Sequence, residues 1–196
     1  MRLPASLVIA ATLAACAPAI HSPPESGVPL RAELQVTERG LEVNVNQRAE
    51  VAVFAILPGT GTYAVYPRRG EVGRVFAPGS SGLRFDGQSG DLRELDQLKV
   101  VLNHRNTLLV LVAGRDLNVD PALRAGTAGD LRAVMGTEAY LAADANRSIA
   151  RLAEMLAGDQ PEQSWATDVK SVSPEALAFL TAGTLAGPGR TSGAGQ

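Results

Sequence analysis

The chain has 196 residues, 45% of them hydrophobic and only 4% aromatic, with a net charge of −2 at neutral pH. This length is sufficient for one sizeable apolar core. The slight negative charge argues against a nucleic-acid partner, and the scarcity of aromatic residues disfavours a carbohydrate-stacking surface.

The first 15 residues have the three parts of an export signal. Arg2 supplies a positive start, residues 3–13 are almost wholly apolar, and two small residues, Ala14 and Ala15, follow. The apolar run is shorter than the roughly 20 residues that a membrane-spanning helix needs. The sequence therefore predicts a cleaved signal over residues 1–15.

The Leu-Ala-Ala-Cys sequence at residues 13–16 resembles the lipobox of bacterial lipoproteins. The resemblance implies a diacylglyceryl group on the Cys16 sulfur, cleavage between Ala15 and Cys16, and a further acyl chain on the new amino terminus. Each buried methylene contributes about 0.8 kcal/mol, so two or three chains hold a protein on a bilayer almost permanently. Ala17 stands where inner-membrane lipoproteins carry aspartate, which favours the outer membrane, with the body facing the periplasm. The alternative is an ordinary secretory signal with a cysteine near its cleavage site.

Cys16 is the only cysteine in the chain. In the oxidising periplasm the mature protein can therefore form no internal disulfide. A cysteine-based zinc site and thiol catalysis are excluded for the same reason. We expect a fold stabilised by its apolar core alone, without a cofactor.

The composition divides the mature chain into four parts. Residues 16–30 are rich in proline and are the expected tether between anchor and body. We expect an antiparallel β-sandwich-like domain over 31–118 and a helical extension packed on it over 119–182. A Gly/Ala/Ser-rich tail, expected to be disordered, covers 183–196. The predicted class is mainly β with two or three C-terminal helices, an α+β architecture.

The strongest strand signals lie in the first half of the body. Alternation over 41–46 predicts a strand with Leu41 and every second residue on one face. The continuous apolar run 51–57 predicts a central strand buried on both faces. The Pro-Gly-Thr-Gly turn at 58–61 then predicts a hairpin into 62–67.

The second half of the β body is less regular. Short strands are expected around 74–76 and 83–85, and a second buried strand over 107–113. Residues 92–104 fit either a helix or a strand.

After residue 118 the apolar period becomes helical. Asp120-Pro121 predicts a helix start, and residues 127–135 a short helix that ends before Gly136. Residues 165–172, which begin with the lone tryptophan, are the candidate for a final edge strand. Ser173-Pro174-Glu175 predicts the start of a last short helix over 176–181.

The longest predicted helix covers 137–157, with Thr137 as its N-cap and Gly158 at its end. Its apolar stripe predicts packing against the sandwich. The stripe consists of Leu141, Ala145, Ile149, Leu152 and Leu156.

The β body also follows a recurrent pattern over residues 41–117. Val51-Ala52-Val53-Phe54 forms one strand, Tyr66-Pro67 ends the next, and an apolar strand runs through 108–117. This pattern resembles the bacterial domain of unknown function 4384 family. The resemblance implies a compact, mainly β accessory domain of envelope or signalling proteins without a known catalytic site. The sequence departs from the family at Gly114, where serine is common, and at Arg68, where asparagine is usual.

Residues with catalytic or metal-binding chemistry form no recognised motif. His21 lies in the tether, and His104 lies among turn-forming residues without HxH or HExxH spacing. The Gly-Ser-Ser-Gly stretch at 79–82 lacks the GxSxG pattern. Five aspartates in expected loops lack the DxDxDG spacing of calcium loops, namely Asp86, Asp91, Asp96, Asp116 and Asp120. We therefore expect no catalytic residue and no metal.

Four arginines form a candidate surface-binding patch: Arg68, Arg69, Arg74 and Arg84. Such a patch would bind phosphate headgroups or an acidic partner, and ordinary surface arginines are the alternative. Together these features indicate a non-enzymatic envelope lipoprotein, bound to the membrane through lipid on Cys16, that binds another protein or an envelope component. A passive spacer and an undetected cell-envelope hydrolase or metal-dependent enzyme are the alternatives.

Overall fold

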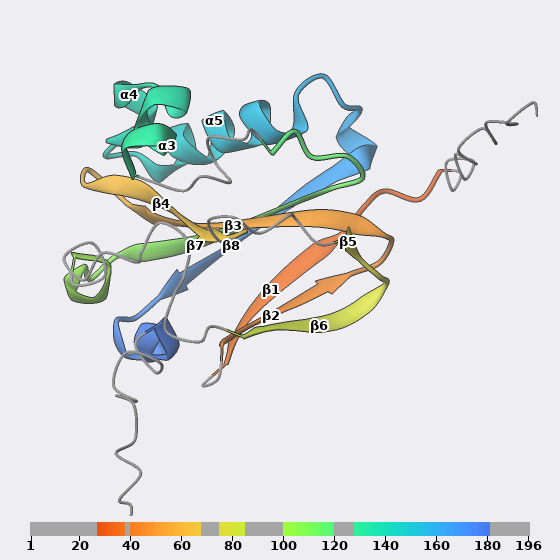
Figure 1. The fold of residues 1–196 in the computed structure, drawn as a ribbon, viewed down its shortest axis with the longest axis horizontal. Helices are drawn as coiled ribbons and strands as arrows, with labels where there is room; N and C mark the ends of the chain where they lie inside the picture. The colour runs from red at the N-terminus through yellow and green to blue at the C-terminus, as the bar shows by residue number, and fades with distance from the viewer. Residues whose placement is uncertain (1–26, 38–39, 68–74, 85–99, 120–127, 181–196) are drawn as a thin grey trace, which may run out of the picture.

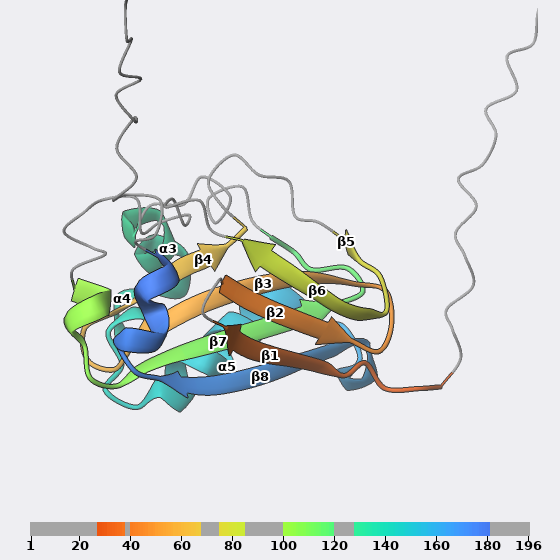
Figure 2. The same cartoon turned by 90° about the horizontal axis from the view of Figure 1, so that it is seen from below.

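The fold was analysed in a computed structural model that describes residues 27–37, 40–67, 75–84, 100–119 and 128–180 (Figures 1 and 2). The predictions for the signal, for Cys16, for the helix start at Asp120 and for the tail lie outside these residues. The described strands are β1 Ala32–Thr37, β2 Gly40–Val45, β3 Ala49–Leu57, β4 Gly61–Tyr66, β5 Val75–Phe76, β6 Gly79–Arg84, β7 Thr107–Gly114 and β8 Trp165–Val172. The helices are α3 Ala128–Met135, α4 Thr137–Tyr140 and α5 Ala145–Ala157, with 3-10 turns η2 Glu162–Ser164 and η3 Glu175–Leu180.

The strands form two antiparallel sheets, one in the order β1-β2-β6 and one in the order β4-β3-β7-β8, with β5 beside β3. The β2–β6 pair continues around a corner as the β3–β5 pair, since Val45 pairs with Gly79 and Ala49 with Phe76. The predicted class, mainly β and sandwich-like with C-terminal helices, is confirmed.

The predicted strands over 41–46, 51–57 and 107–113 are confirmed as β2, β3 and β7. The hairpin is confirmed as well, because β4 pairs with β3 and Thr60 N–H donates to the Leu57 carbonyl over 2.9 Å. The predictions did not include β1, although Ala32, Leu34 and Val36 alternate with polar residues.

Residues 100–103 form a helical turn, and residues 92–99 of the ambiguous segment lie outside the described residues. The short strand predicted around 74–76 is confirmed as β5, whereas the one predicted around 83–85 overlaps only the end of β6, which begins at Gly79.

The molecule has three layers (Figure 1). One apolar core lies between the two sheets, and a second lies between the five-stranded sheet and the helices. Strand β3 supplies both cores: Val53 and Ala55 face the first, and Phe54 and Ile56 face the second. This explains why β3 reads as a continuous apolar run rather than an alternation. Among the described residues, no helix is both long and apolar enough to cross a membrane.

The prediction of one helix over 137–157 is wrong, because the chain leaves the helical path between α4 and α5. In a continuous helix the Ala142 carbonyl would accept a hydrogen bond from Asn146 N–H. Instead it accepts from Gly59 N–H over 2.9 Å, and Asn146 N–H donates to the Asp144 carboxylate over 3.0 Å. Asp144 is thus the N-cap of α5. The tip of the β3–β4 hairpin therefore interrupts the helix.

The other details of that prediction follow from the break. Thr137 makes no capping hydrogen bond, and its hydroxyl instead accepts from Arg132 Nε over 3.3 Å. Leu141, predicted in the buried stripe, is 37% exposed, whereas Leu152 and Leu156 are fully buried. The shorter helix predicted over 127–135 is confirmed as α3.

The C-terminal segment returns to the sandwich. Strand β8 confirms the predicted edge strand and pairs along the whole of β7, and η3 confirms the last helical segment as a 3-10 turn. Residue 27 and residue 180, the two ends of the described chain, lie at opposite ends of the molecule (Figures 1 and 2).

Candidate binding surfaces

The edge strands β1 and β8 belong to different sheets but lie side by side, and we call the line along which they meet the seam (Figure 2). One carboxylate bridges it: Asp168 Oδ2 accepts a hydrogen bond from Leu34 N–H over 2.7 Å. Asp168 Oδ2 also lies 3.3 Å from Lys170 Nζ. A side chain on β8 therefore provides the partner that Leu34, on an edge strand, does not find in its own sheet.

The seam has a hollow at each end. The hollow at the end where the predicted tether joins the body, which we call the anchor-end hollow, has a volume of about 490 Å³ and lies beside the starts of both strands. It is lined by Leu30, Arg31, Ala32, Glu162, Trp165, Ala166 and Thr167. The far-end hollow, of about 350 Å³, lies between Leu34–Val36 and Lys170–Ser173. The Leu34–Asp168 bond lies between the two hollows.

The chain that enters β1 is fixed to the body by a hydrogen-bonded clamp beside the anchor-end hollow. Gln47, only 6% exposed, donates from Nε2 to the Val28 carbonyl over 2.6 Å, and its Oε1 accepts from Arg115 Nη2 over 2.7 Å. Asn46 Nδ2 donates to the Pro29 carbonyl over 2.9 Å. The last residues of the predicted tether are therefore held at a defined place.

Leu30 extends this attachment to the C-terminal part of the chain. Its N–H donates to the Gln163 carbonyl in η2 over 2.9 Å, and its side chain is buried. Because Leu30 lies beside Gln163 and Leu34 beside Asp168, β1 and β8 run in the same direction.

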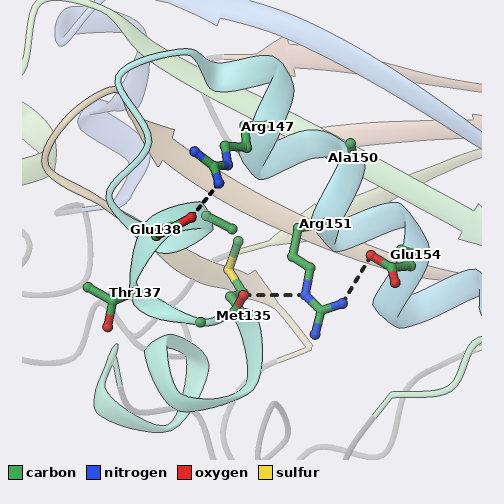
Figure 3. A pocket seen from close by; sticks show the side chains of 9 residues that line it. Met135, Thr137, Glu138, Arg147, Ala150, Arg151 and Glu154 are labelled. Atoms are coloured by element: carbon green, nitrogen blue, oxygen red, sulfur yellow. Dashed lines mark hydrogen bonds and ion pairs between the residues drawn. The ribbon is translucent and has the colours of Figure 1, made fainter.

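A groove of about 470 Å³ lies between the α3–α4 turn and α5 (Figure 3). Arg151 Nε donates to the Met135 carbonyl over 3.3 Å, which provides a partner for the C-terminal end of α3, and its Nη1 lies 3.0 Å from Glu154. Arg147 forms an ion pair with Glu138. Both arginines that line this groove have carboxylate partners, so the groove does not present arginine charge without an ion pair.

The structure does not bring the candidate catalytic residues together. His104 follows the 100–103 turn, where its Nδ1 accepts from Asn106 N–H over 3.4 Å. Ser80 and Ser81 lie on β6, paired with Asn44 and Val43. Among the described residues, no cluster of His, Cys, Asp or Glu could hold a metal ion.

Most of the predicted binding residues cannot be placed. Arg68, Arg69 and Arg74 lie outside the described residues, and Arg84 ends β6. Of the five aspartates, Asp116 is exposed after β7, and the other four lie outside the described residues. Trp165 is half-buried and lines the anchor-end hollow. The sequence did not predict the seam, because the contacts between β1 and β8 join residues far apart in the chain and leave no local pattern.

One carboxyl group in the C-terminal turn has a perturbed acidity. The pKa of Glu175 is lowered, chiefly by a hydrogen bond with the Ser173 side chain and then by one with its own backbone. Ser173 Oγ also accepts from Ala176 N–H over 3.4 Å, so it caps the start of η3. This pair has a structural role at the helix start.

Comparison of the chain with family models, curated proteins and solved structures gives no match. The resemblances to lipoproteins and to the domain of unknown function 4384 family therefore stay predictions.

Proposed function

We propose that this protein is a bacterial envelope lipoprotein, held on the membrane by lipid at Cys16, whose β body binds another envelope protein or component without catalysis. The observation that carries the proposal is the Leu-Ala-Ala-Cys sequence at residues 13–16, placed directly after an apolar export signal. The absence of an inner-membrane sorting residue at Ala17 favours the outer membrane, with the body in the periplasm.

The clamp at Val28–Leu30 is consistent with an anchored protein. Residues 17–26 lie between Cys16 and the first described residue, and ten residues span at most about 35 Å when fully extended. A lipid on Cys16 would therefore keep the body within about 35 Å of the bilayer surface, close enough to meet partners embedded in the same membrane.

Lipidation is tested by expressing the wild-type chain and Cys16→Ser in a bacterium that processes lipoproteins. The wild type is expected to incorporate labelled palmitate, to have the mass of an acylated chain that begins at Cys16, and to sediment with outer-membrane vesicles. Cys16→Ser is expected to lose the label. A wild-type chain cleaved elsewhere and free of acyl groups would contradict the proposal.

The binding role is tested by crosslinking in cells, followed by recovery of the protein from membranes. A specific protein or envelope component is expected with the wild type and is expected to be lost or reduced with Cys16→Ser. Recovery of no partner would favour a passive spacer.

The rival hydrolase is tested with His104→Ala and Ser80→Ala, which are expected to complement a deletion strain fully. Failure of these folded variants to complement would favour the enzyme.

A further inference from the structure

Three side chains suited to a membrane surface lie at the end of the body where the predicted tether joins it. Val28 is 58% exposed. Trp165 is half-buried and Arg31 is exposed, and both side chains line the anchor-end hollow. The bond between Leu30 N–H and the Gln163 carbonyl, 2.9 Å long, holds the two chain segments together here. An exposed valine, a tryptophan and an arginine are thus combined at one end.

We infer that this end of the body rests on the lipid bilayer, with Trp165 at the level of the headgroups and Arg31 beside lipid phosphates. The inference rests on the proposed lipid anchor, because it concerns how the anchored body is oriented. It assigns the anchor-end hollow a lipid surface as its partner.

The chemistry of the three side chains suits this partner. Tryptophan has an apolar ring and a polar N–H, and it is enriched where a membrane meets water. An arginine guanidinium matches phosphate geometry and keeps its charge. Val28 lacks the cover that most large apolar side chains have in this fold, and a lipid surface would remove it from water.

The attachment of the tether favours this end over the others. Residues 17–26 allow a separation of at most about 35 Å, and Leu30, which follows them closely in the chain, lines the hollow. Acidic Glu162 lines the same hollow as Arg31, so charge attraction alone is weak. The anchor instead supplies a high effective concentration of lipid surface, so weak contacts are sufficient.

The clamp fixes the point at which the tether meets the body. Because Gln47 is buried and binds both the Val28 carbonyl and Arg115, Val28 is held at a fixed point on the body. Breaking this clamp lengthens the free part of the tether and is expected to loosen the orientation.

The experiment uses Trp165 as reporter, since it is the only tryptophan in the chain. The lipidated protein is incorporated into vesicles of phosphatidylethanolamine and phosphatidylglycerol with or without brominated acyl chains. We expect the bromine atoms to quench part of the Trp165 emission and the emission maximum to move to shorter wavelength. Emission unchanged by brominated lipid would overturn the inference.

A matched control places the single tryptophan at the opposite end of the body. Val100 is 41% exposed and precedes Val101, whose carbonyl accepts from the hydroxyl of Thr107 at the start of β7. Trp165 instead pairs with Gly114 at the end of β7. Seven residue-to-residue steps along β7 separate these ends, about 23 Å. The double variant Trp165→Phe/Val100→Trp is expected to keep its emission in brominated vesicles. Equal quenching at both ends would mean a random orientation and would also overturn the inference.

Two further variants test the cause. Arg31→Glu is expected to reduce the quenching of Trp165, and Gln47→Ala is expected to bring the quenching at the two ends closer together. Circular dichroism checks that both variants fold. Acylation is verified by mass before each measurement, so an unacylated chain refutes the proposed function, whereas an acylated chain with unquenched Trp165 refutes only the orientation.

Discussion

Asp168 and Leu34 lie 134 residues apart in the chain, yet the Asp168 carboxylate accepts the Leu34 N–H over 2.7 Å and joins the edges of the two sheets. Asp168 Oδ1 also accepts from Val169 N–H over 2.9 Å, which fixes the direction of the carboxylate. The bond satisfies a donor on an edge strand that could otherwise pair with another chain.

Removal of the Asp168 carboxylate is expected to weaken the seam. Asp168→Ala leaves the Leu34 N–H without its partner, and we expect the free energy of unfolding to fall by about 1–3 kcal/mol in urea titrations. The Leu34 amide is also expected to exchange its hydrogen faster by NMR. Asp159→Ala, at an exposed turn residue, is the control and is expected to change stability by less than about 0.5 kcal/mol. Equal stability of the two variants would refute a role for the bond.

Serine in place of Gly114 is expected to destabilise this chain. A Cβ atom on Gly114 would overlap Leu117 Cδ2 and lie 3.1 Å from Leu117 Cγ. Overpacking of this kind costs about 1–3 kcal/mol, which we expect for Gly114→Ser by thermal or urea unfolding. Gly82→Ser on β6 is the control, since a Cβ there meets nothing within 4 Å. A stable Gly114→Ser protein would mean that Leu117 moves aside without cost.

Two buried threonines are expected to respond in opposite directions to the same substitution. The Thr62 hydroxyl is buried without a hydrogen-bond partner, whereas the Thr107 hydroxyl donates to the carbonyls of Val101 and His104 over 3.4 and 3.3 Å. Thr62→Val removes an unsatisfied polar group and is expected to raise the free energy of unfolding by about 1 kcal/mol. Thr107→Val is expected to lower it by about 1 kcal/mol. A loss of stability in Thr62→Val would contradict the assignment.

The stability of the start of η3 is expected to depend on the ionisation of the Glu175 carboxyl group. Because the pKa of Glu175 is lowered in the folded protein, its stabilising contribution is present above the ordinary glutamate value of about 4.3 and is lost as the pH falls through the folded pKa. Ser173→Ala removes the largest cause and is expected to return the pKa toward its ordinary value. The carboxyl chemical shift of Glu175, followed by NMR, measures this. An unchanged pKa in Ser173→Ala would assign the shift to the backbone instead.

Local signals determined much of the fold. The apolar run of β3, the Pro-Gly-Thr-Gly turn, and the apolar run of β7 predicted their elements correctly, because strand burial and turn geometry depend on adjacent residues. The mainly β class with C-terminal helices followed from the same patterns. The sequence also supplied the lipobox prediction at Cys16, since such a signal is read as a linear motif.

The tertiary structure alone decided the contacts between distant segments. The apolar period of residues 137–157 predicts one continuous helix. Gly59 N–H donates to the Ala142 carbonyl, and the helix is interrupted there. Asp168 reaches Leu34 and creates a seam with a hollow at each end. The sequence periodicity does not predict these hydrogen bonds, because their partners lie far apart in the chain. Such partners are determined by their positions in the folded structure and not by their spacing in the sequence.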